Sequence, residues 1–418
     1  MADLNPITET SLRPLCIAVY HNLPSGGAKR TLHAILKRLN ERHHLDLYDL
    51  SCSNRDFCDV RPFVAETFTY PFNPLPDLHR PFGRLNFAAR LLDLFRLDRL
   101  QRRIAADIDQ RGYDVVYVHP CQFSQTPALL RFLKTPSLYH SREPLRASFS
   151  EPIIDRPYRN VRRGMRRLLD HLDFVAHAYR HRLQSNEQLG SQRASLVVTN
   201  SYFTREALYR FYGVDARVCY HGVDSEAFRP LDLPRDGCVL SVGALTPAKG
   251  FAFIVQSLAL IPANIRPALT IVSNYQVGDE LTYLSDLAET CGVSVEFRTR
   301  ITNEELVRLY NTAPMVVYAP IMEPFGLVAL EAMACGTPVV AVCEGGVRES
   351  VVHGQTGLFV DRDPVQFAQA VETLIKDSQL ASRYGQQARE YVLSQWRWKD
   401  AIHKLESYLL RAQRNDMV

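Results

Sequence analysis

EPFGLVALEAMACGTPVV, residues 323–340, is the most informative stretch of the chain, because it sets two carboxylates eight residues apart around the start of a predicted helix. Pro324 can start a helix at no cost in hydrogen bonds, and residues 327–334 continue it until a Gly-Thr-Pro stop that precedes a strand. Gly326 lets a ligand approach the backbone, and the free N–H groups at a helix start attract phosphate. Glu331 falls at the edge of the apolar face of this helix, so its carboxylate needs a partner. The stretch therefore predicts a phosphate-binding helix start flanked by Glu323 and Glu331.

This stretch resembles the Glu-x7-Glu signature of the glycosyltransferases of family 4, which are two-domain retaining enzymes of the GT-B fold that use nucleotide-diphosphate sugars. The resemblance implies that Glu323 holds the hydroxyls of the transferred sugar and that Glu331 holds the ribose hydroxyls. It also implies that the backbone of Phe325, Gly326 and Leu327 contacts sugar and phosphate. The alternative interpretation of the same residues is a helix that carries an ordinary surface glutamate.

The length and composition narrow the class of protein. A chain of 418 residues is too long to fold around one ordinary hydrophobic core, so two domains of about 200 residues each are expected. A hydrophobic content of 46% and a charged content of 22% are typical of a soluble globular protein, and a net charge of +4 is too small to indicate a nucleic acid as partner. The nine cysteines are scattered, without a Cys-x-x-Cys pair or ligand-spaced histidines, which predicts reduced thiols, no metal and a cytoplasmic protein. Residues 1–14 are polar and the apolar run at 15–20 is short, so neither a signal peptide nor a transmembrane helix is predicted.

Short apolar runs alternate with helical patterns in both halves, which predicts an α/β protein built on parallel sheets. The predicted strands are residues 15–20, 114–118, 137–139, 174–176 and 196–199 in the first half and 238–242, 268–272, 293–297, 315–319 and 338–342 in the second. The resemblance makes this a GT-B fold, with two Rossmann-like domains that face each other across a cleft. An acceptor-binding domain is expected at 1–210, an interdomain passage at 211–236 and a nucleotide-sugar-binding domain at 237–394. By resemblance, the helix at 395–418 packs back across the domain junction.

The predicted junction carries a short motif and two tryptophans. Tyr220-His-Gly-Val-Asp224 resembles the Asn-Gly-Val-Asp passage at which this family enters its C-terminal domain, with His221 in place of asparagine. A turn explains the passage equally well. Trp396 and Trp398 are predicted to be core residues rather than platforms for a sugar, since large aromatic side chains mostly serve packing.

Cations are expected at the diphosphate, because moving its charge out of water without compensation would cost on the order of tens of kcal/mol. The loop after the predicted strand at 238–242 ends in Lys249, which is the candidate cation. Family members usually have arginine where this chain has Ala244, so either another arginine reaches in, or donor binding is weak, or catalysis is lost. Arg348 is one candidate replacement, although an ion pair with Glu344 or Glu349 is the simpler use of its charge.

Three further residues are assigned to the donor by resemblance. Gly27, in the Gly-Gly turn after the first predicted strand, matches the family's glycine loop near the diphosphate, although many α/β proteins carry such a turn for backbone geometry only. Arg298 and Arg300 correspond to the loop that borders the nucleotide base, with Thr299 where glycine is usual.

The loop after the predicted strand at 137–139 carries the candidate residue of the reacting end. Relatives often have histidine directly before a Glu-Pro pair, and matching that pair here places Arg142 at the histidine position. Arginine cannot act as a base near neutral pH, but it can hold a phosphate of the donor or of a phosphorylated acceptor. His119 is another candidate for the cleft, for which a structural role is the simpler interpretation.

The first half also carries a basic surface. Arg159, Arg162, Arg163 and Arg166 form a strongly basic helical face, and the segment 80–103 mixes arginine with phenylalanine and leucine. Such a surface suits a lipid-phosphate acceptor and an anionic membrane. A solvated helix face balanced by nearby aspartates is an equal alternative.

Together these features predict a retaining glycosyltransferase that moves a hexosyl unit from a nucleotide-diphosphate sugar to a glycan or lipid-linked glycan acceptor. Glu323, Lys249 and Arg142 are the predicted catalytic residues, and neither a bound cofactor nor a metal is expected. Peripheral association with the cytoplasmic face of a membrane is a further hypothesis. The alternative is a catalytically silent GT-B protein that binds sugar nucleotides or scaffolds a glycan pathway, for which Ala244 is the main argument.

Overall fold

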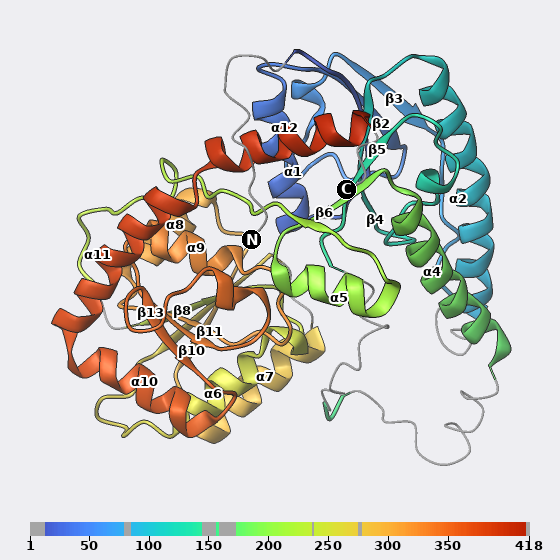
Figure 1. Ribbon diagram of the computed structural model, residues 1–418. Coiled ribbons are helices and arrows are strands. Elements are labelled where there is room, and N and C mark those ends of the chain that lie inside the picture. The colour runs from blue at the N-terminus through green and yellow to red at the C-terminus, as the bar shows by residue number, and fades with distance from the viewer. Residues whose placement is uncertain are drawn as a thin grey trace.

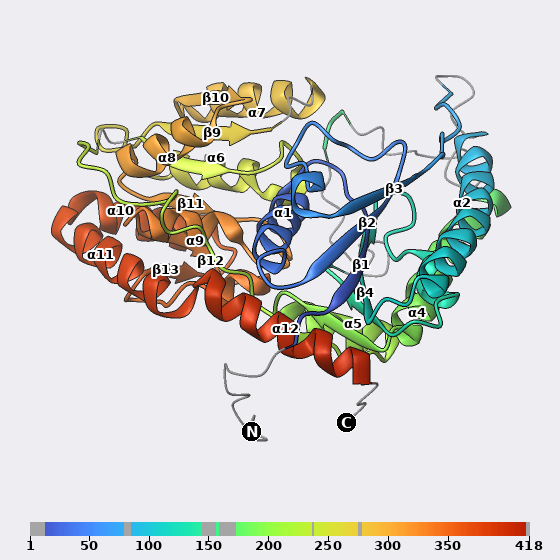
Figure 2. The same cartoon turned by 90° about the horizontal axis from the view of Figure 1, so that it is seen from above.

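The computed structural model describes residues 13–78, 85–143, 156–158, 173–235, 238–274 and 278–414, which fold around two parallel β-sheets (Figures 1 and 2). The first sheet has seven strands in the order β3-β2-β1-β4-β5-β6-β7, and the second has six in the order β10-β9-β8-β11-β12-β13. The strands of the first sheet are β1 (Cys16–Asn22), β2 (His44–Leu50), β3 (Glu66–Tyr70), β4 (Val115–Cys121), β5 (Ser137–His140), β6 (Leu196–Thr199) and β7 (Arg217–Val218). Those of the second are β8 (Val239–Val242), β9 (Leu269–Ser273), β10 (Val295–Thr299), β11 (Val316–Tyr318), β12 (Val339–Val342) and β13 (Gly357–Val360). The predicted α/β class with two Rossmann-like units is confirmed.

Helices cover both faces of each sheet. The helices of the first half are α1 (Gly27–Leu39), α2 (Leu85–Gln110), α4 (Phe174–Arg193) and α5 (Tyr202–Tyr212). The helices of the second half are α6 (Phe251–Ala259), α7 (Gly278–Cys291), α8 (Asn303–Thr312), α9 (Leu327–Ala334), α10 (Pro364–Lys376), α11 (Ser378–Gln395) and α12 (Trp398–Arg414). Among the described residues, no helix combines the length and the apolar character needed to cross a membrane.

The alternation of side chains along each strand explains the two helical layers. In β1, Ile17 and Val19 pack with α1 and α12, whereas Ala18 and Tyr20 pack with α2 and α5 on the other face. The second sheet is arranged in the same way, with α8, α9 and α11 on one face and α6, α7 and α10 on the other. Both faces of both sheets are therefore buried, as parallel sheets require.

The C-terminal helix α12 belongs to the first half in space, although it ends the chain (Figure 1). Ile402, Leu405 and Leu409 lie in the same hydrophobic cluster as residues of β1 and α1. At the crossing, Val223 donates a backbone hydrogen bond to the carbonyl oxygen of Trp396 at 3.0 Å. A Cβ atom on Gly222 would lie 2.5 Å from the backbone nitrogen of Trp398, so only glycine fits there. The chain thus passes between the two sheets twice, and the two passages pack against each other.

One predicted strand is wrong, and four strands of the two sheets were not predicted. The apolar run at 174–176 begins helix α4 instead, because the side chain of Asp173 accepts a hydrogen bond from the backbone N–H of Ala176 at 2.9 Å and caps the helix. Phe174 is 81% exposed, so the apolar residues there do not mark a buried strand. The strands that were not predicted are β2, β3, β7 and β13. Buried Asp46 and Asp49 interrupt the apolar pattern of β2, and β7 has only two residues.

Candidate functional site

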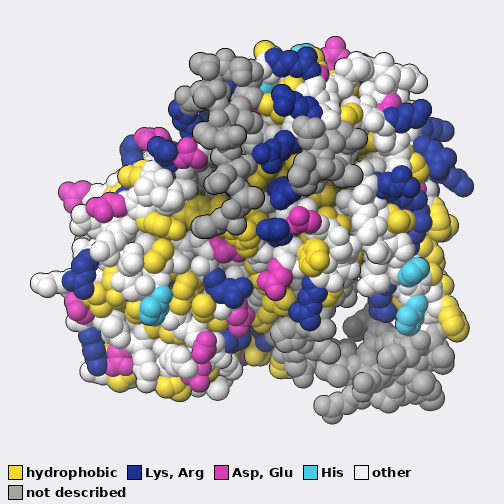
Figure 3. All heavy atoms as spheres, in the orientation of Figure 1, with side chains coloured by type: hydrophobic (Ala, Val, Ile, Leu, Met, Phe, Trp, Pro, Cys, Tyr) yellow, Lys and Arg dark blue, Asp and Glu magenta, His cyan; other side chains and the backbone are white. Residues whose placement is uncertain are grey.

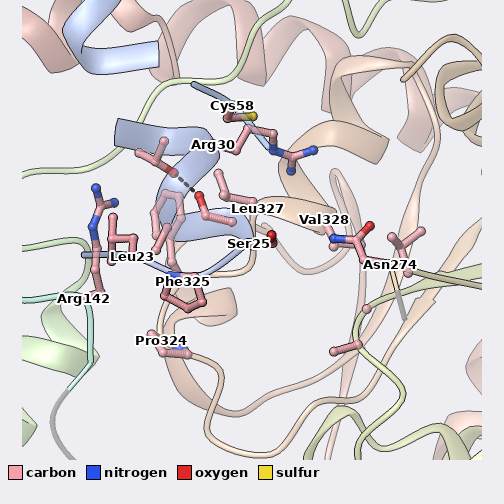
Figure 4. A pocket seen from close by; sticks show the side chains of 18 of the residues that line it. Leu23, Ser25, Arg30, Cys58, Arg142, Asn274, Pro324, Phe325, Leu327 and Val328 are labelled. Carbon is pink, nitrogen blue, oxygen red and sulfur yellow. Dashed lines mark hydrogen bonds between the residues drawn. The ribbon is translucent and has the colours of Figure 1, made fainter. Parts of the chain in front are cut away.

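A cavity of about 640 Å³ lies between the two sheets and is lined by both halves of the chain (Figure 4). Its lining residues follow the carboxyl ends of β1, β4 and β5 in the first sheet and of β8, β9 and β11 in the second. Loops at the carboxyl ends of parallel strands are where α/β proteins bind ligands. The fold therefore brings together the predicted site residues Gly27, Arg142, Lys249, Glu323 to Leu327 and Glu331, all of which line this cavity.

The start of α9 is shaped by glycines on both sides. Gly326 precedes the helix with a φ of 92°, a left-handed conformation that favours glycine, and the helix starts without a side-chain cap. Two further glycines hold the preceding loop: a Cβ atom on Gly345 would lie 2.4 Å from the carbonyl oxygen of Glu323, and one on Gly346 would lie 2.1 Å from that of Pro324. Gly346 also donates its N–H to the Glu323 carbonyl at 2.7 Å. Because the first N–H groups of a helix have no partner within it, this end of α9 can receive an anion.

Lys249 and Glu323 form an ion pair in this cavity, with 2.6 Å between Nζ and Oε2. Lys249 ends a short 3-10 helix, and the next residue, Gly250, has a φ of 71°. A Cβ atom on Gly250 would lie 1.9 Å from the carbonyl oxygen of Ala319, so glycine is required for the loop to approach β11 this closely. The pair thus joins two loops that the sequence separates by 74 residues.

Glu331 is held by two side chains. Its Oε1 accepts a hydrogen bond from Arg30 of α1, and its Oε2 accepts one from the hydroxyl of Tyr310 at 3.0 Å. Burial raises the pKa of the Glu331 carboxyl, and Arg30 and Tyr310 act in the opposite direction. Arg30 also lines the cavity and was not predicted as a site residue. The available signal was its position on the first turn of a helix that follows the Gly-Gly turn.

The starts of α1 and α9 face each other across the domain junction. A Cβ atom on Gly27 would lie 3.6 Å from Cδ1 of Leu327, and both residues line the cavity. The Ser201 hydroxyl at the start of α5 donates a hydrogen bond to the Pro324 carbonyl at 2.6 Å, which joins the same two halves. Two helix starts therefore border one cavity, and each favours a negative group.

Arg142 lies in the wall of the cavity that the first half of the chain forms, and it is only 7% exposed. Its Nη1 lies 2.6 Å from Nε2 of His221 and its Nη2 lies 3.5 Å from Nδ1 of His119. Burial lowers the pKa of the guanidinium to about 10, and burial together with Arg142 lowers the pKa of both imidazoles well below the usual range. Arg142 therefore stays charged near neutral pH, and both histidines stay neutral.

The structure places other predicted residues away from the cavity. Arg298 is exposed and pairs with Glu296 at 2.9 Å, Arg300 is exposed with a φ of 53°, and neither lines the cavity. Arg348 is also exposed, and its Nε donates to the Gly345 carbonyl at 3.0 Å.

The expected pairing of Arg348 with a neighbouring glutamate is wrong. Glu344 pairs with Arg362 at 2.8 Å, and Glu349 accepts hydrogen bonds from the Tyr220 hydroxyl and from backbone N–H groups at the start of α5. The basic residues Arg159, Arg162, Arg163 and Arg166 lie outside the described residues.

Trp396 is buried against Tyr220 and Phe325, in agreement with the prediction of a core role. Trp398 is partly buried at the junction, where the guanidinium of Arg38 lies over its ring at 5.0 Å from the centroid. Across the described ranges, no group of three or more histidine, cysteine, aspartate or glutamate residues is placed to hold a metal ion.

Two family models match the chain. The model described as Glycosyltransferase Family 4 matches residues 25–227, and the model described as Glycosyl transferases group 1 matches residues 224–391. The two matches meet at the passage between the sheets and leave only the two ends of the chain unmatched.

Curated relatives are glycosyltransferases. A D-inositol 3-phosphate glycosyltransferase of Acidothermus cellulolyticus is 30% identical over 339 residues, which are 75% of this chain and 68% of that protein. One of the same name from Corynebacterium jeikeium is 34% identical over 52% of this chain and 58% of its own length. A GDP-mannose-dependent alpha-(1-6)-phosphatidylinositol monomannoside mannosyltransferase of Mycobacterium tuberculosis is 33% identical over 51% of this chain and 61% of its own length. The chain thus spans between about half and two thirds of the length of such relatives.

Solved structures share the arrangement of both halves. Sucrose-phosphate synthase from Thermosynechococcus elongatus superposes with a TM-score of 0.72 at 22% identity, covering 96% of this chain and 99% of that one. HepE from Anabaena, in complex with UDP and glucose, superposes with a TM-score of 0.67 at 20% identity, covering 95% and 99%. At this identity the likeness concerns the fold alone.

Proposed function

The chain belongs to glycosyltransferase family 4 and has the GT-B fold, and we propose that it transfers a hexosyl unit, with retention of configuration, from a nucleotide-diphosphate sugar to a glycan or lipid-linked glycan acceptor. In this proposal the cavity between the sheets is the donor site. Glu323 and Lys249 act on the sugar and on the phosphate next to it, and Glu331 holds the ribose.

The observation that carries the proposal is the 2.6 Å contact between Lys249 and Glu323 beside the start of α9. The bond that breaks in a sugar nucleotide joins a hydroxyl-bearing ring to a phosphate, so a site for it needs an acceptor of hydroxyl protons beside a cation. A carboxylate offers about four lone pairs and an ammonium three donors, so one shared hydrogen bond leaves both groups able to bind substrate. The hydrogen bond therefore orients both side chains and leaves further donors and lone pairs free for substrate.

The phosphates would meet Lys249 and the facing starts of α1 and α9. This arrangement supplies a fixed positive potential where negative charge develops on the leaving nucleotide. Such electrostatic stabilisation of the transition state is usually the largest single contribution to catalysis. Ala244, where the family resemblance leads us to expect arginine, also lines the cavity, and among the described lining residues the remaining cations, Arg30 and Arg142, come from the other half of the chain.

Retention would follow if the acceptor attacks from the face on which the phosphate leaves. The acceptor oxygen then bonds to the anomeric carbon as the bond from that carbon to the phosphate oxygen breaks, and the hydroxyl proton passes to a phosphate oxygen. The protein's contribution would be positioning and charge stabilisation by Glu323 and Lys249.

The donor base and the acceptor are proposed by analogy with relatives. HepE is described with UDP and glucose, and the mycobacterial relative is named for GDP-mannose and a phosphatidylinositol monomannoside. We take a nucleoside diphosphate sugar as donor and a glycan or lipid-linked acceptor on this basis.

An anionic membrane surface is the further proposed partner. Helices α2 and α4 expose apolar side chains, with Leu92 56%, Phe95 48% and Phe174 81% exposed. Arginines are exposed on the same two helices, namely Arg96, Arg99, Arg102, Arg103 and Arg180. Lysine and arginine gather along this edge of the molecule together with hydrophobic side chains (Figure 3). Basic side chains beside exposed apolar ones suit anionic lipid.

A thermal-shift screen tests the proposed donor site. The purified protein is heated with UDP, GDP, ADP, dTDP and their sugars, because a ligand that binds only the native state raises the melting temperature. We expect one nucleotide family to raise it in the wild type and to do so less in Lys249→Ala. No shift with any nucleotide would contradict the proposed function.

A further inference from the structure

Arg142 is a buried cation whose described partners are all neutral. It contacts His221 and His119, and no carboxylate of the described residues pairs with it. Its Nε has no hydrogen-bond partner in the described part of the chain, although the side chain is 93% buried in the protein. A buried charge without a counter-ion is costly, so such a residue is rarely kept for stability alone.

The imidazoles around Arg142 cannot supply the missing negative charge. His119, His140 and His221 are all buried, and burial followed by the charge of Arg142 lowers the pKa of each. His140 Nδ1 is engaged with the Tyr117 hydroxyl at 2.7 Å, and the ring centroids of His140 and His221 lie 5.4 Å apart. His119 and His221 therefore contact the guanidinium without compensating its charge.

Arg142 stands apart from the other cations of the cavity. Arg30 and Lys249 each pair with a glutamate, whereas Arg142 does not. In the close view Arg142 lies on one side of the cavity beside Leu23, and Asn274 from the second half lies on the opposite side (Figure 4). Arg142 therefore belongs to the wall formed by the first half of the chain.

We propose that Arg142, oriented by His221 and His119, binds a phosphate group of a substrate, whose charge completes this part of the cavity. Guanidinium groups suit phosphate because they present several N–H donors in one plane, and each Nη of Arg142 has a second N–H beyond its histidine contact. The inference rests on the proposed function, which makes the cavity a site for phosphate-bearing substrates. The phosphate belongs either to the donor diphosphate or to the acceptor, and the two sources can be separated.

Titration calorimetry on the full chain separates them. The variants are Arg142→Gln, which removes the charge, and Arg142→Lys, which keeps it, with Arg383→Gln as a control that removes an exposed arginine of α11 outside the cavity lining. The probes are UDP, GDP, the nucleosides uridine and guanosine, and inorganic phosphate in the presence of a saturating nucleotide, all at constant ionic strength.

We expect Arg142→Gln to lower the affinity for a phosphate-bearing probe by about tenfold or more and to leave the affinity for the nucleosides unchanged. The affinity of Arg142→Lys should be intermediate, and that of the control should equal the wild-type value. Weaker binding of the nucleoside diphosphates assigns the group to the donor, whereas weaker binding of inorganic phosphate alone assigns it to the acceptor. A merely structural role of Arg142 would weaken phosphate-bearing and phosphate-free probes alike.

Unchanged binding of every phosphate-bearing probe in folded Arg142→Gln would overturn the inference while leaving the proposed function intact. If that variant does not fold, Arg142→His replaces it, and binding equal to that of Arg142→Lys would overturn the inference in the same way. A wild-type protein that binds phosphate but no nucleotide would contradict the proposed function, and titration with inorganic phosphate alone would then decide the role of Arg142.

Discussion

Replacing Arg30 by methionine tests how strongly the two halves of the protein are joined at Glu331. Arg30 belongs to the first half and Glu331 to the second, 301 residues later in the chain. The carboxylate is 4% exposed, whereas the guanidinium is 33% exposed. In Arg30→Met the buried carboxylate keeps only the hydrogen bond from Tyr310, at 3.0 Å.

The size of the effect follows from this burial. Removing one partner of a fully buried pair costs about 3–5 kcal/mol, because the other charge is left uncompensated. Arg30 is partly exposed and the hydrogen bond from Tyr310 remains. We therefore expect a loss of about 2 kcal/mol in the free energy of unfolding, between the values for an exposed pair and for a fully buried pair. For domains of this size that loss lowers the melting temperature by about 4–8 °C.

The loss should depend on pH with a definite sign. Burial raises the pKa of Glu331 in the folded state, so folding favours its protonated form and this contribution to stability falls as pH rises. Without Arg30 the pKa rises further, so the deficit of Arg30→Met should be larger at pH 8 than at pH 5. Melting followed by circular dichroism at both pH values measures it.

A double-mutant cycle and a matched control make the test specific. Glu331→Gln removes the buried charge, so adding it to Arg30→Met should recover part of the loss, with a coupling of about 1–2 kcal/mol. Arg205→Met breaks an exposed pair with Asp215 at 2.8 Å and should change stability by no more than about 0.5 kcal/mol. An unchanged melting temperature in Arg30→Met, or strictly additive effects in the cycle, would refute the reasoning.

Two further predictions concern turnover and the membrane. Lys249→Ala and Glu323→Ala should each lower kcat on the order of a hundredfold or more with unchanged circular dichroism, since both remove charge placed at the reacting bond, and normal turnover in both would contradict the site assignment. The protein should sediment with anionic vesicles at low salt and be released as salt screens the arginines of α2 and α4, whereas protein that stays in the supernatant at low salt would contradict membrane association.

The part of the site that lies within one short segment could be predicted from the sequence. Glu323, Gly326 and Glu331 sit on one loop and one helix, so their relative placement follows from local backbone rules alone. Gly345 and Gly346 follow the next strand, β12, and their close approach to Glu323 and Pro324 explains why glycine is needed there.

The contacts between the two halves could not be predicted in this way. Arg30 and Glu331 are joined only by the packing of two domains, and nothing local to α1 distinguishes Arg30 from Lys29, which turns instead to Asn54. Arg298 and Arg300 show a second limit of the sequence. The residues that follow them, Ile301, Thr302 and Asn303, line the cavity, but the two arginines do not.

The position of Ala244 illustrates what the fold adds. The sequence left open whether another arginine replaces the one missing there, and Arg348 was the candidate within the same half. In the structure the arginines that line the cavity, Arg30 and Arg142, come from the first half, while Lys249 comes from the second. If phosphate is held by cations from both halves, the donor stabilises the apposition of the two halves, because each half alone lacks part of the charge. Donor affinity and the apposition of the two halves should then vary together, so a substitution that loosens the Arg30 contact should weaken nucleotide binding even though it leaves Lys249 and Glu323 in place.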